Sequence, residues 1–451
     1  MKKIFYLLFI SSSCFAQLSV ETKLFSPEEL KQDLAFLFEK LEAIHPSLYH
    51  YTSRTKVDEA RASVESELNR PMTRIDFARK VIPLVSMLGD AHTSLAFPQE
   101  ERIAFLKNGG KIFPFDVLIR ENKIFITTNY STDSTLSTIA EILSINGKPT
   151  IEFLTELRLY ISAELDFYRD ARLQKAFRAM LWNVYGWGDD FELQLLIEGE
   201  PVSKKITGIT ERELAAAIKK HGKQQSAKAY AFFILENRIG VIDFRSMRDL
   251  KKFSLFLDST FAEIKKNNIQ HLVIDIRNNG GGDSKLGDAL FNYITSKPYK
   301  QFAGVKIKNS VEAGLVKNVN SKKNGAIRVI DTTPLIPPKK PSNKFTGKTY
   351  LLTSHLTFSS AHALASAFAC YHMGTIIGEE TGGVLAPFGD LIELRLPNTQ
   401  LQAWCSHKKF VHPCADETLH GVKPDVEVIP TLEDFRTGKD AVLEYVKKQV
   451  Q

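Results

Sequence analysis

The residues with the clearest chemical potential are Ser359 and Ser360, which lie where a strand is expected to pass into a helix. The segment 348–352 is apolar and predicts a buried strand, whereas 363–369 consists of small residues and helix formers. At such a junction a serine hydroxyl stands clear of the strand, and the first free N–H groups of the helix face the place where an oxyanion would form. Ser359 is therefore a candidate nucleophile. The alternative is that Ser359 only caps the helix, a role that serine fills well.

A second candidate is the run of three glycines at 280–282, which follows an apolar strand expected at 271–276. Glycines let the backbone approach a ligand closely and turn its N–H groups toward it. A phosphate-binding loop is one interpretation, but the Gly-Lys-Ser/Thr ending and the GxGxxG spacing are both missing. The run could instead form half of an oxyanion hole for a nucleophile on a neighbouring strand, such as Ser359. A flexible turn without a function is the third interpretation.

Three regions with different patterns follow one another along the chain and would have to position these residues. Apolar residues recur at helical spacing over 26–97, which predicts an N-terminal helical domain at 17–100. Short strands with one or two helices predict a compact α+β module at 105–208. Over 225–451 strands alternate with helices, which predicts an α/β domain with a long, partly hairpin-like insertion at 299–345.

The N-terminus has the pattern of a secretory signal peptide at 1–16. Lys2 and Lys3 precede a short apolar run and small residues up to Ala16. That run is too short to span a bilayer, and no later stretch is long and apolar enough to do so. The sequence therefore predicts an exported protein, periplasmic or extracellular, with no integral membrane segment after removal of the signal. A lipid anchor on Cys14 is the alternative, although the residues before it lack the expected aliphatic side chain.

Charge and cysteine usage exclude some partners. The formal net charge is +7, but no basic stripe interleaved with aromatic residues is present, so we do not expect nucleic acid binding. Cys405 and Cys414 flank His407 and His412 at a spacing that matches no usual zinc pattern. We therefore expect a disulfide between these cysteines, or free thiols, rather than a metal site. Cys370 falls in an expected buried helix and is interpreted as a small apolar residue.

Several segments together resemble the tail-specific (C-terminal-processing) and tricorn-like serine peptidases, in the order that this family shows. They are 142–147 (ILSING), 274–282 (IDIRNNGGG), 357–361 (TFSSA), 377–383 (IGEETGG) and 421–425 (GVKPD). The resemblance covers most of the chain after the signal. It implies a crotonase-like α/β catalytic core at 225–451, a PDZ-like module at 105–208, and catalysis without a metal or an organic cofactor.

The resemblance also implies roles for residues in the catalytic core. Ser359 would be the nucleophile, and the N–H groups of Ser360 and of a glycine in the run, with Gly281 and Gly282 as candidates, would form the oxyanion hole. Tail-specific members use a lysine base just after the segment that matches 377–383. Here the matching position is Val384, so a serine–lysine dyad is not expected.

The tricorn-like branch instead uses a histidine from the N-terminal region. Residues 89–93 (GDAHT) resemble its histidine motif, so His92 is the expected general base. Glu417 is by its position in that branch the expected acidic partner, which would orient the imidazole or bind the substrate amine, and Asp416 is the alternative. His362 is an alternative base that helical geometry places poorly relative to Ser359.

Together these expectations predict an exported serine endopeptidase that acts on a peptide or protein through an acyl-enzyme on Ser359. The PDZ-like module would dock an extended peptide, such as the C-terminal end of a substrate, by strand addition. A different class remains open: some relatives bind apolar ligands without cleaving peptides, so the chain could be a binding protein on the same fold. An esterase would use the same site.

Overall fold

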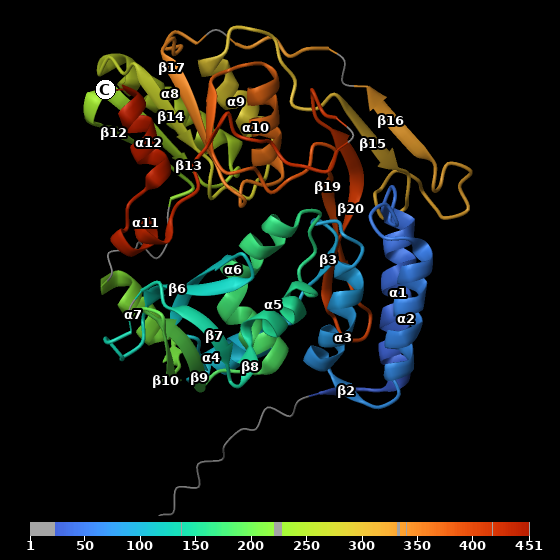
Figure 1. Ribbon diagram of the computed structural model, residues 1–451. Helices are drawn as coiled ribbons and strands as arrows, with labels where there is room; N and C mark the ends of the chain where they lie inside the picture. The colour runs from blue at the N-terminus through green and yellow to red at the C-terminus, as the bar shows by residue number, and fades with distance from the viewer. Residues whose placement is uncertain are drawn as a thin grey trace, which may run out of the picture.

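The computed structural model describes residues 23–136, 138–220, 228–331, 334–339, 341–416 and 418–450, and its fold is mixed α/β (Figure 1). The signal peptide expected at 1–16, with Cys14, lies outside the described residues. Among the helices that are described, none has both the length and the apolar character needed to cross a membrane.

The first region is helical. Its elements are β1 (Leu24–Phe25), α1 (Pro27–Ile44), α2 (Arg54–Glu67), β2 (Met72–Thr73), α3 (Arg74–Ser86) and β3 (Ser94–Leu95). Helix α1 begins with a capping box: the Ser26 side chain accepts a hydrogen bond from the Glu29 N–H, and the Glu29 carboxylate accepts one from the Ser26 N–H. The apolar stripe of α1 is buried, including Leu30, Leu34 and Leu37.

The second region is an antiparallel sheet with helices packed on it. Its elements are α4 (Gln99–Lys107), β4 (Lys111–Ile112), β5 (Phe115–Arg120), β6 (Lys123–Asn129), β7 (Glu141–Ile145), β8 (Lys148–Pro149), α5 (Thr150–Arg158), α6 (Asp166–Tyr185), β9 (Asp190–Ile197), β10 (Glu200–Thr207), β11 (Ile209–Thr210) and α7 (Glu211–Lys220). The strand order is β10-β9-β7-β6-β5, with β8 paired to β7. Phe153 of α5 and Phe177 of α6 share one apolar core with Phe191 of β9.

The third region contains the parallel sheet that carries the candidate nucleophile. Its elements are β12 (Tyr230–Leu235), the 3-10 helix η1 (Glu236–Arg238), β13 (Ile239–Phe244), α8 (Leu250–Lys266), β14 (His271–Asp275), α9 (Lys285–Ile294), β15 (Gly304–Lys308), β16 (Ile327–Asp331), β17 (Lys348–Thr353), α10 (Ser360–Cys370), β18 (Thr375–Gly378), β19 (Phe388–Arg395), β20 (Gln402–Val411), β21 (Val426–Glu427), α11 (Leu432–Thr437) and α12 (Ala441–Val450). Helix α11 ends at Gly438, which has φ +68°, and α12 begins three residues later.

The order of this sheet is β12-β13-β14-β17-β18-β21, and all neighbours after β12 pair in parallel. Ile274 and Leu351 pack in the core with α8, α9 and α10, whereas Val273 and Leu352 pack with α12, so both faces are covered. Strands β14 and β17 are direct neighbours, with Asp275 opposite Leu352. The loops after them, which carry the glycine run and Ser359, therefore leave the same edge of the sheet side by side.

Another antiparallel sheet connects the helical first region to the parallel sheet of the third region (Figure 1). Its order is β16-β15-β20-β19, and β3 adds to β20. The hairpin expected within 299–345 is formed by β15 and β16. The turn between β19 and β20 docks on α1, where the buried carboxylate of Asp33 accepts hydrogen bonds from the backbone N–H groups of Asn398 and Thr399. These contacts fix β3 and the residues just before it relative to the third region.

The cysteine pairing expected from the sequence is wrong. The disulfide joins Cys370 to Cys414, while Cys405 is buried and free. Cys405 lies in β20, where its thiol packs against the backbone of α1 near Leu41. Cys370 ends α10 and lies 5.8 Å from Cys414 between Cα atoms, so it is not merely a small apolar residue. A cross-link at a sequence separation of 44 is expected to stabilise the fold by roughly 4 kcal/mol through the unfolded state.

Candidate active site

Ser359 does not act as a helix cap, although it occupies the N-cap position of α10. Its side chain makes no capping hydrogen bond, and its backbone has the strained conformation φ 53°, ψ −126°. Its hydroxyl instead lies 3.1 Å from Nε2 of His92. A strained residue of this kind costs about 1–3 kcal/mol and persists where the surrounding structure enforces it, often at active sites. The turn thus presents the Ser359 hydroxyl to a base.

His92 is held rigidly in the turn between α3 and β3. Its backbone N–H donates to Oδ1 of Asp90 at 2.9 Å, and its ring stacks on Phe358 with 4.5 Å between ring centroids. Phe358 in turn stacks on Tyr168 of α6 with 4.4 Å between centroids. Ser94, two residues after His92, pairs with Trp404 of β20. The imidazole is therefore positioned by all three regions of the chain.

Asp90 is the acidic group that the structure places beside His92. Its carboxylate is buried and accepts hydrogen bonds from the hydroxyls of Thr93 at 2.5 Å and Ser406 at 2.6 Å. Its Oδ2 also lies 3.2 Å from Nε2 of His45. Because Nδ1 of His45 accepts the backbone N–H of Ser47, the proton of this ring is on Nε2, which donates to Asp90.

The electrostatics keep Asp90 charged and His92 neutral. Burial opposes the ionisation of Asp90, but the hydrogen bonds from His45 and Ser406 hold the pKa of Asp90 below its ordinary value. Burial lowers the pKa of His92 below its ordinary value of 6.5, against the raising effect of Asp90 and with the help of Arg172. A neutral imidazole at neutral pH is the form that can accept a proton.

The glycine loop packs directly against the nucleophile turn. Gly281 has φ +95°, and a Cβ atom there would lie 2.7 Å from Cβ of Ser359 and 2.8 Å from the N atom of Ser360. The Ser360 hydroxyl donates to the carbonyl oxygen of Gly282 at 2.5 Å. Only a residue without a side chain allows this approach of two backbones.

The candidate oxyanion donors are not equivalent. The Gly281 N–H already donates to Oδ1 of Asn279 at 2.9 Å. The buried amide of Asn279 also donates to the backbone carbonyl of Phe244, so it ties the loop to β13. Within the described part of the chain, the N–H groups of Gly282 and Ser360 make no hydrogen bond. Of the donors expected from the sequence, these two are available to a substrate oxygen.

A cavity of about 980 Å³ opens over these groups. It reaches from His92 and Ser359 to an apolar wall that includes the half-buried Phe302 and Phe410. This volume is at the upper end of the range for small-molecule sites and can hold several residues of an extended peptide. An apolar side chain of a substrate could pack on the phenylalanine wall while its backbone lies across Ser359.

The other residues expected from the sequence lie elsewhere or are not described. His362 is buried, and its Nδ1 bonds the hydroxyl of Thr381 at 2.7 Å, so it does not contact Ser359. Asp416 is partly exposed, bonds Thr418 and His420, and makes no bond to His92. Glu417 lies outside the described residues.

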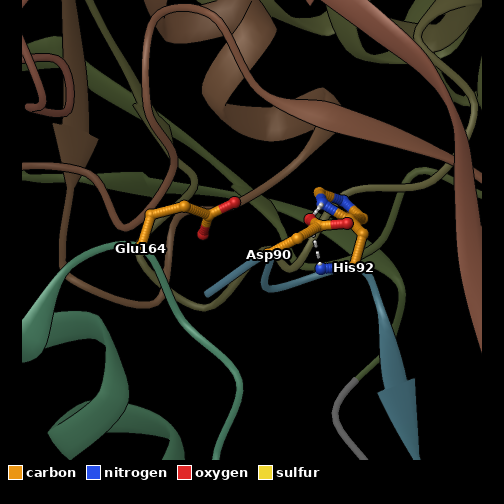
Figure 2. Close-up of side chains that lie close together, drawn as sticks. All are labelled: Asp90, His92 and Glu164. Atoms are coloured by element: carbon orange, nitrogen blue, oxygen red, sulfur yellow. Dashed lines mark hydrogen bonds and ion pairs between the residues drawn. The ribbon is translucent and has the colours of Figure 1, made fainter. Parts of the chain in front are cut away.

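Two acidic residues beside His92 were missed by the sequence interpretation. Figure 2 shows Asp90, His92 and Glu164 with their side chains directed toward one another. One carboxylate oxygen of Asp90, one carboxylate oxygen of Glu164 and one ring nitrogen of His92 lie within 4.8 Å of one another. Asp90 belongs to the 89–93 segment, so its proximity to the imidazole was readable from the sequence. Glu164 is distant in sequence, and no local pattern marks it.

Comparisons with known proteins find one family model and several solved structures of similar fold. Residues 238–428 match the model of peptidase family S41. The crystal structure of mature CPAF has a TM-score of 0.66 at 13% identity, over 94% of this chain and 96% of that chain. Mature CPAF complexed with lactacystin has a TM-score of 0.65 at 14% identity, over 94% and 98%.

A putative peptidase from Parabacteroides merdae has a TM-score of 0.51 at 14% identity, over 94% of this chain and 97% of that chain. At these identities the likeness shows a shared fold that extends over nearly the whole chain. No curated protein matches the sequence at a significant level.

Proposed function

We propose that this chain, a serine-type peptidase whose residues 238–428 belong to family S41, hydrolyses peptide bonds through an acyl-enzyme on Ser359 with His92 as the general base. The observation that carries this assignment is the 3.1 Å contact between Nε2 of His92 and Oγ of Ser359, in a half-buried turn whose serine makes no cap. Neither residue has a structural role that would require this contact.

In the proposed reaction, Nε2 of His92 accepts the hydroxyl proton as Oγ of Ser359 attacks the substrate carbonyl carbon. The N–H groups of Ser360 and Gly282 face the developing oxyanion, and each well-placed donor contributes roughly 2.7–4 kcal/mol in the transition state. His92 then gives the proton to the leaving amine. In the second half of the cycle His92 takes a proton from water, the water oxygen attacks the carbonyl carbon of the acyl-enzyme, and the proton returns to Oγ of Ser359 as the acid product leaves.

Asp90 is proposed to stabilise the imidazolium that forms in this cycle. Its Oδ1 lies 4.0 Å from Nδ1 of His92, too far for a hydrogen bond but close enough for charge stabilisation in a buried site. The role given to Glu417 from its position in the family stays a prediction. Asp416, the alternative, points to His420 instead.

The wider organisation is part of the proposal. The third region would be a crotonase-like catalytic core at 225–451, preceded by a helical domain at 17–100 and a PDZ-like module at 105–208 that docks an extended peptide. Export after cleavage of the signal at 1–16 is supported by the Cys370–Cys414 disulfide, because such bonds persist in oxidising compartments.

Proteolysis of an unfolded protein tests this function. Wild-type protein should cleave reduced and alkylated casein into peptides, and Ser359→Ala should leave the casein intact while keeping the wild-type circular dichroism spectrum. Fragments formed equally by both proteins would exclude Ser359 as the nucleophile. If the wild type and Ser359→Ala both left casein intact and both bound apolar ligands, the binding-protein alternative would be favoured.

The pH dependence of the reaction at Ser359 should report the ionisation of His92. Because its pKa lies below 6.5 and the base must be unprotonated, the acidic limb of the rate that is due to His92 should have its midpoint below pH 6.5. Asp90→Asn removes a group that raises this pKa, so its acidic limb should move to lower pH and its plateau rate should fall. Rates of labelling by a fluorophosphonate probe measure both. A profile without a limb centred below pH 6.5, or an upward shift of that limb in Asp90→Asn, would contradict the assignment.

A further inference from the structure

Glu164 is a buried acid for which the fold offers no pairing. It lies in the loop before α6, and within the described chain neither of its carboxyl oxygens has a hydrogen-bond partner. A buried polar group without a partner costs about 1–3 kcal/mol. Figure 2 shows its carboxyl group directed toward Asp90 and His92, and both carboxyl oxygens are buried. The stability of the fold therefore does not explain this side chain.

The groups around Glu164 come from three elements. Asp90 and His92 face it from the turn after α3, Arg172 and Tyr168 from α6, and Tyr51 from the turn before α2. Burial and the charge of Asp90 raise the pKa of Glu164 to about 8, while the charge of Arg172 and the nearby backbone N–H groups of Glu164 and Ala91, which do not reach hydrogen-bond geometry, oppose this.

Arg172 makes no hydrogen bond to Glu164 within the described residues. Its guanidinium donates to the backbone carbonyl oxygens of Ser162 at 2.7 Å and of Ala91 at 3.3 Å. Arg172 therefore braces the loop of Glu164 against the turn of His92. The carboxyl group of Glu164 is left facing the imidazole side of the site.

The ring of His92 also contains an atom without a hydrogen-bond partner among the described residues. This atom is Nδ1, which is buried. The acceptor capacity of Asp90 is largely used by the hydroxyls of Thr93 and Ser406, by His45 and by the backbone N–H of His92. When the proton of Ser359 moves to Nε2, the N–H at Nδ1 carries part of the positive charge and requires a negative group nearby.

We propose that Glu164 is a positioning residue that, together with Asp90, stabilises the imidazolium formed when His92 takes the proton of Ser359. This inference rests on the proposed function and adds a second acid to it. The proton balance is simple: Oγ of Ser359 loses one proton to Nε2 of His92, and Glu164 acts as an ionised carboxylate that has released its own proton to solvent. Its effect on the rate should therefore grow as the pH rises through the range in which Glu164 ionises.

The test compares the pH profiles of fluorophosphonate labelling for the wild type and for Glu164→Gln, which keeps the shape of the side chain but cannot ionise. Wild-type labelling should show a second rise near pH 8, above the one due to His92. Glu164→Gln should lose this rise and react roughly 10-fold more slowly above it. Glu164→Asp should keep a second rise, and Glu152→Gln, an exposed acid on α5, should behave as wild type.

The possible failures are distinguishable. A Glu164→Gln profile that superimposes on that of wild type would overturn this inference and leave the proposed function standing. A rate lowered equally at every pH, with the second rise retained, would show a structural role and would also overturn it. Wild-type protein that is folded but never labelled would instead remove the proposed function on which the inference rests.

Discussion

Replacing His92 by alanine should lower the rate of acylation of Ser359 by about 10⁴-fold, because no other described base lies within hydrogen-bonding reach of Oγ. The alternative base named from the sequence is His362. Its Nδ1 bonds the hydroxyl of Thr381, and burial lowers the pKa of His362 well below the ordinary value. The rate of labelling by a fluorophosphonate probe, measured on protein with unchanged circular dichroism, gives this number directly.

A matched control for this variant is His372→Ala. His372 is exposed and lies between α10 and β18, at the amino ends of the parallel strands, whereas the site lies at their carboxyl ends. It should label at the wild-type rate. If His92→Ala also labelled at that rate, the proton would have to leave Ser359 by another route and the assignment of the base would be wrong.

The second large effect is expected at Gly281. In Gly281→Ala the new methyl group would have to occupy space 2.7 Å from Cβ of Ser359 and 2.9 Å from the carbonyl oxygen of Phe358, at a φ of +95°. The nucleophile turn must then move, and a shift of about 1 Å in a reacting group can cost 10²-fold in rate. We expect a labelling rate at least about 10²-fold lower, together with a loss of stability of about 1–3 kcal/mol from the strained backbone.

Gly280→Ala provides the control for this substitution. A Cβ atom at Gly280 meets nothing within 4 Å, and its φ does not lie in the left-handed region. This variant should keep both the labelling rate and the denaturant midpoint of the wild type. Equal rates in the two variants would mean that the close approach of Gly281 to Ser359 does not position the nucleophile.

Much of the architecture was predictable because periodicity is a local property of the sequence. The buried strand β14, the glycine run after it and the helix after Ser359 follow one another as the pattern indicated, and parallel pairing then brings the two loops together. The contact between His92 and Ser359 spans 267 positions, and only the family resemblance suggested it. The structure places the two side chains in contact.

The parts that could not be predicted depend on contacts between distant segments. The β19–β20 hairpin was not expected, yet Ser406 on β20 helps to keep Asp90 ionised and Trp404 pairs with the strand that follows His92. The pairing of Cys370 with Cys414 follows from how α10 ends against the loop after β20, whereas short sequence spacing favoured Cys405. Glu164 is set in place by the loop before α6, and nothing in its local sequence distinguishes it from a surface acid.

The central claim is that Ser359 is an activated nucleophile, and the most direct measurement is site-mapped labelling of the mature wild-type protein by a fluorophosphonate probe, with Ser359→Ala in parallel. We predict one modified peptide, with the adduct on Oγ of Ser359 and no adduct in the variant. An adduct on another residue, an unchanged signal in Ser359→Ala, or a folded wild-type protein that takes up no label would contradict the claim.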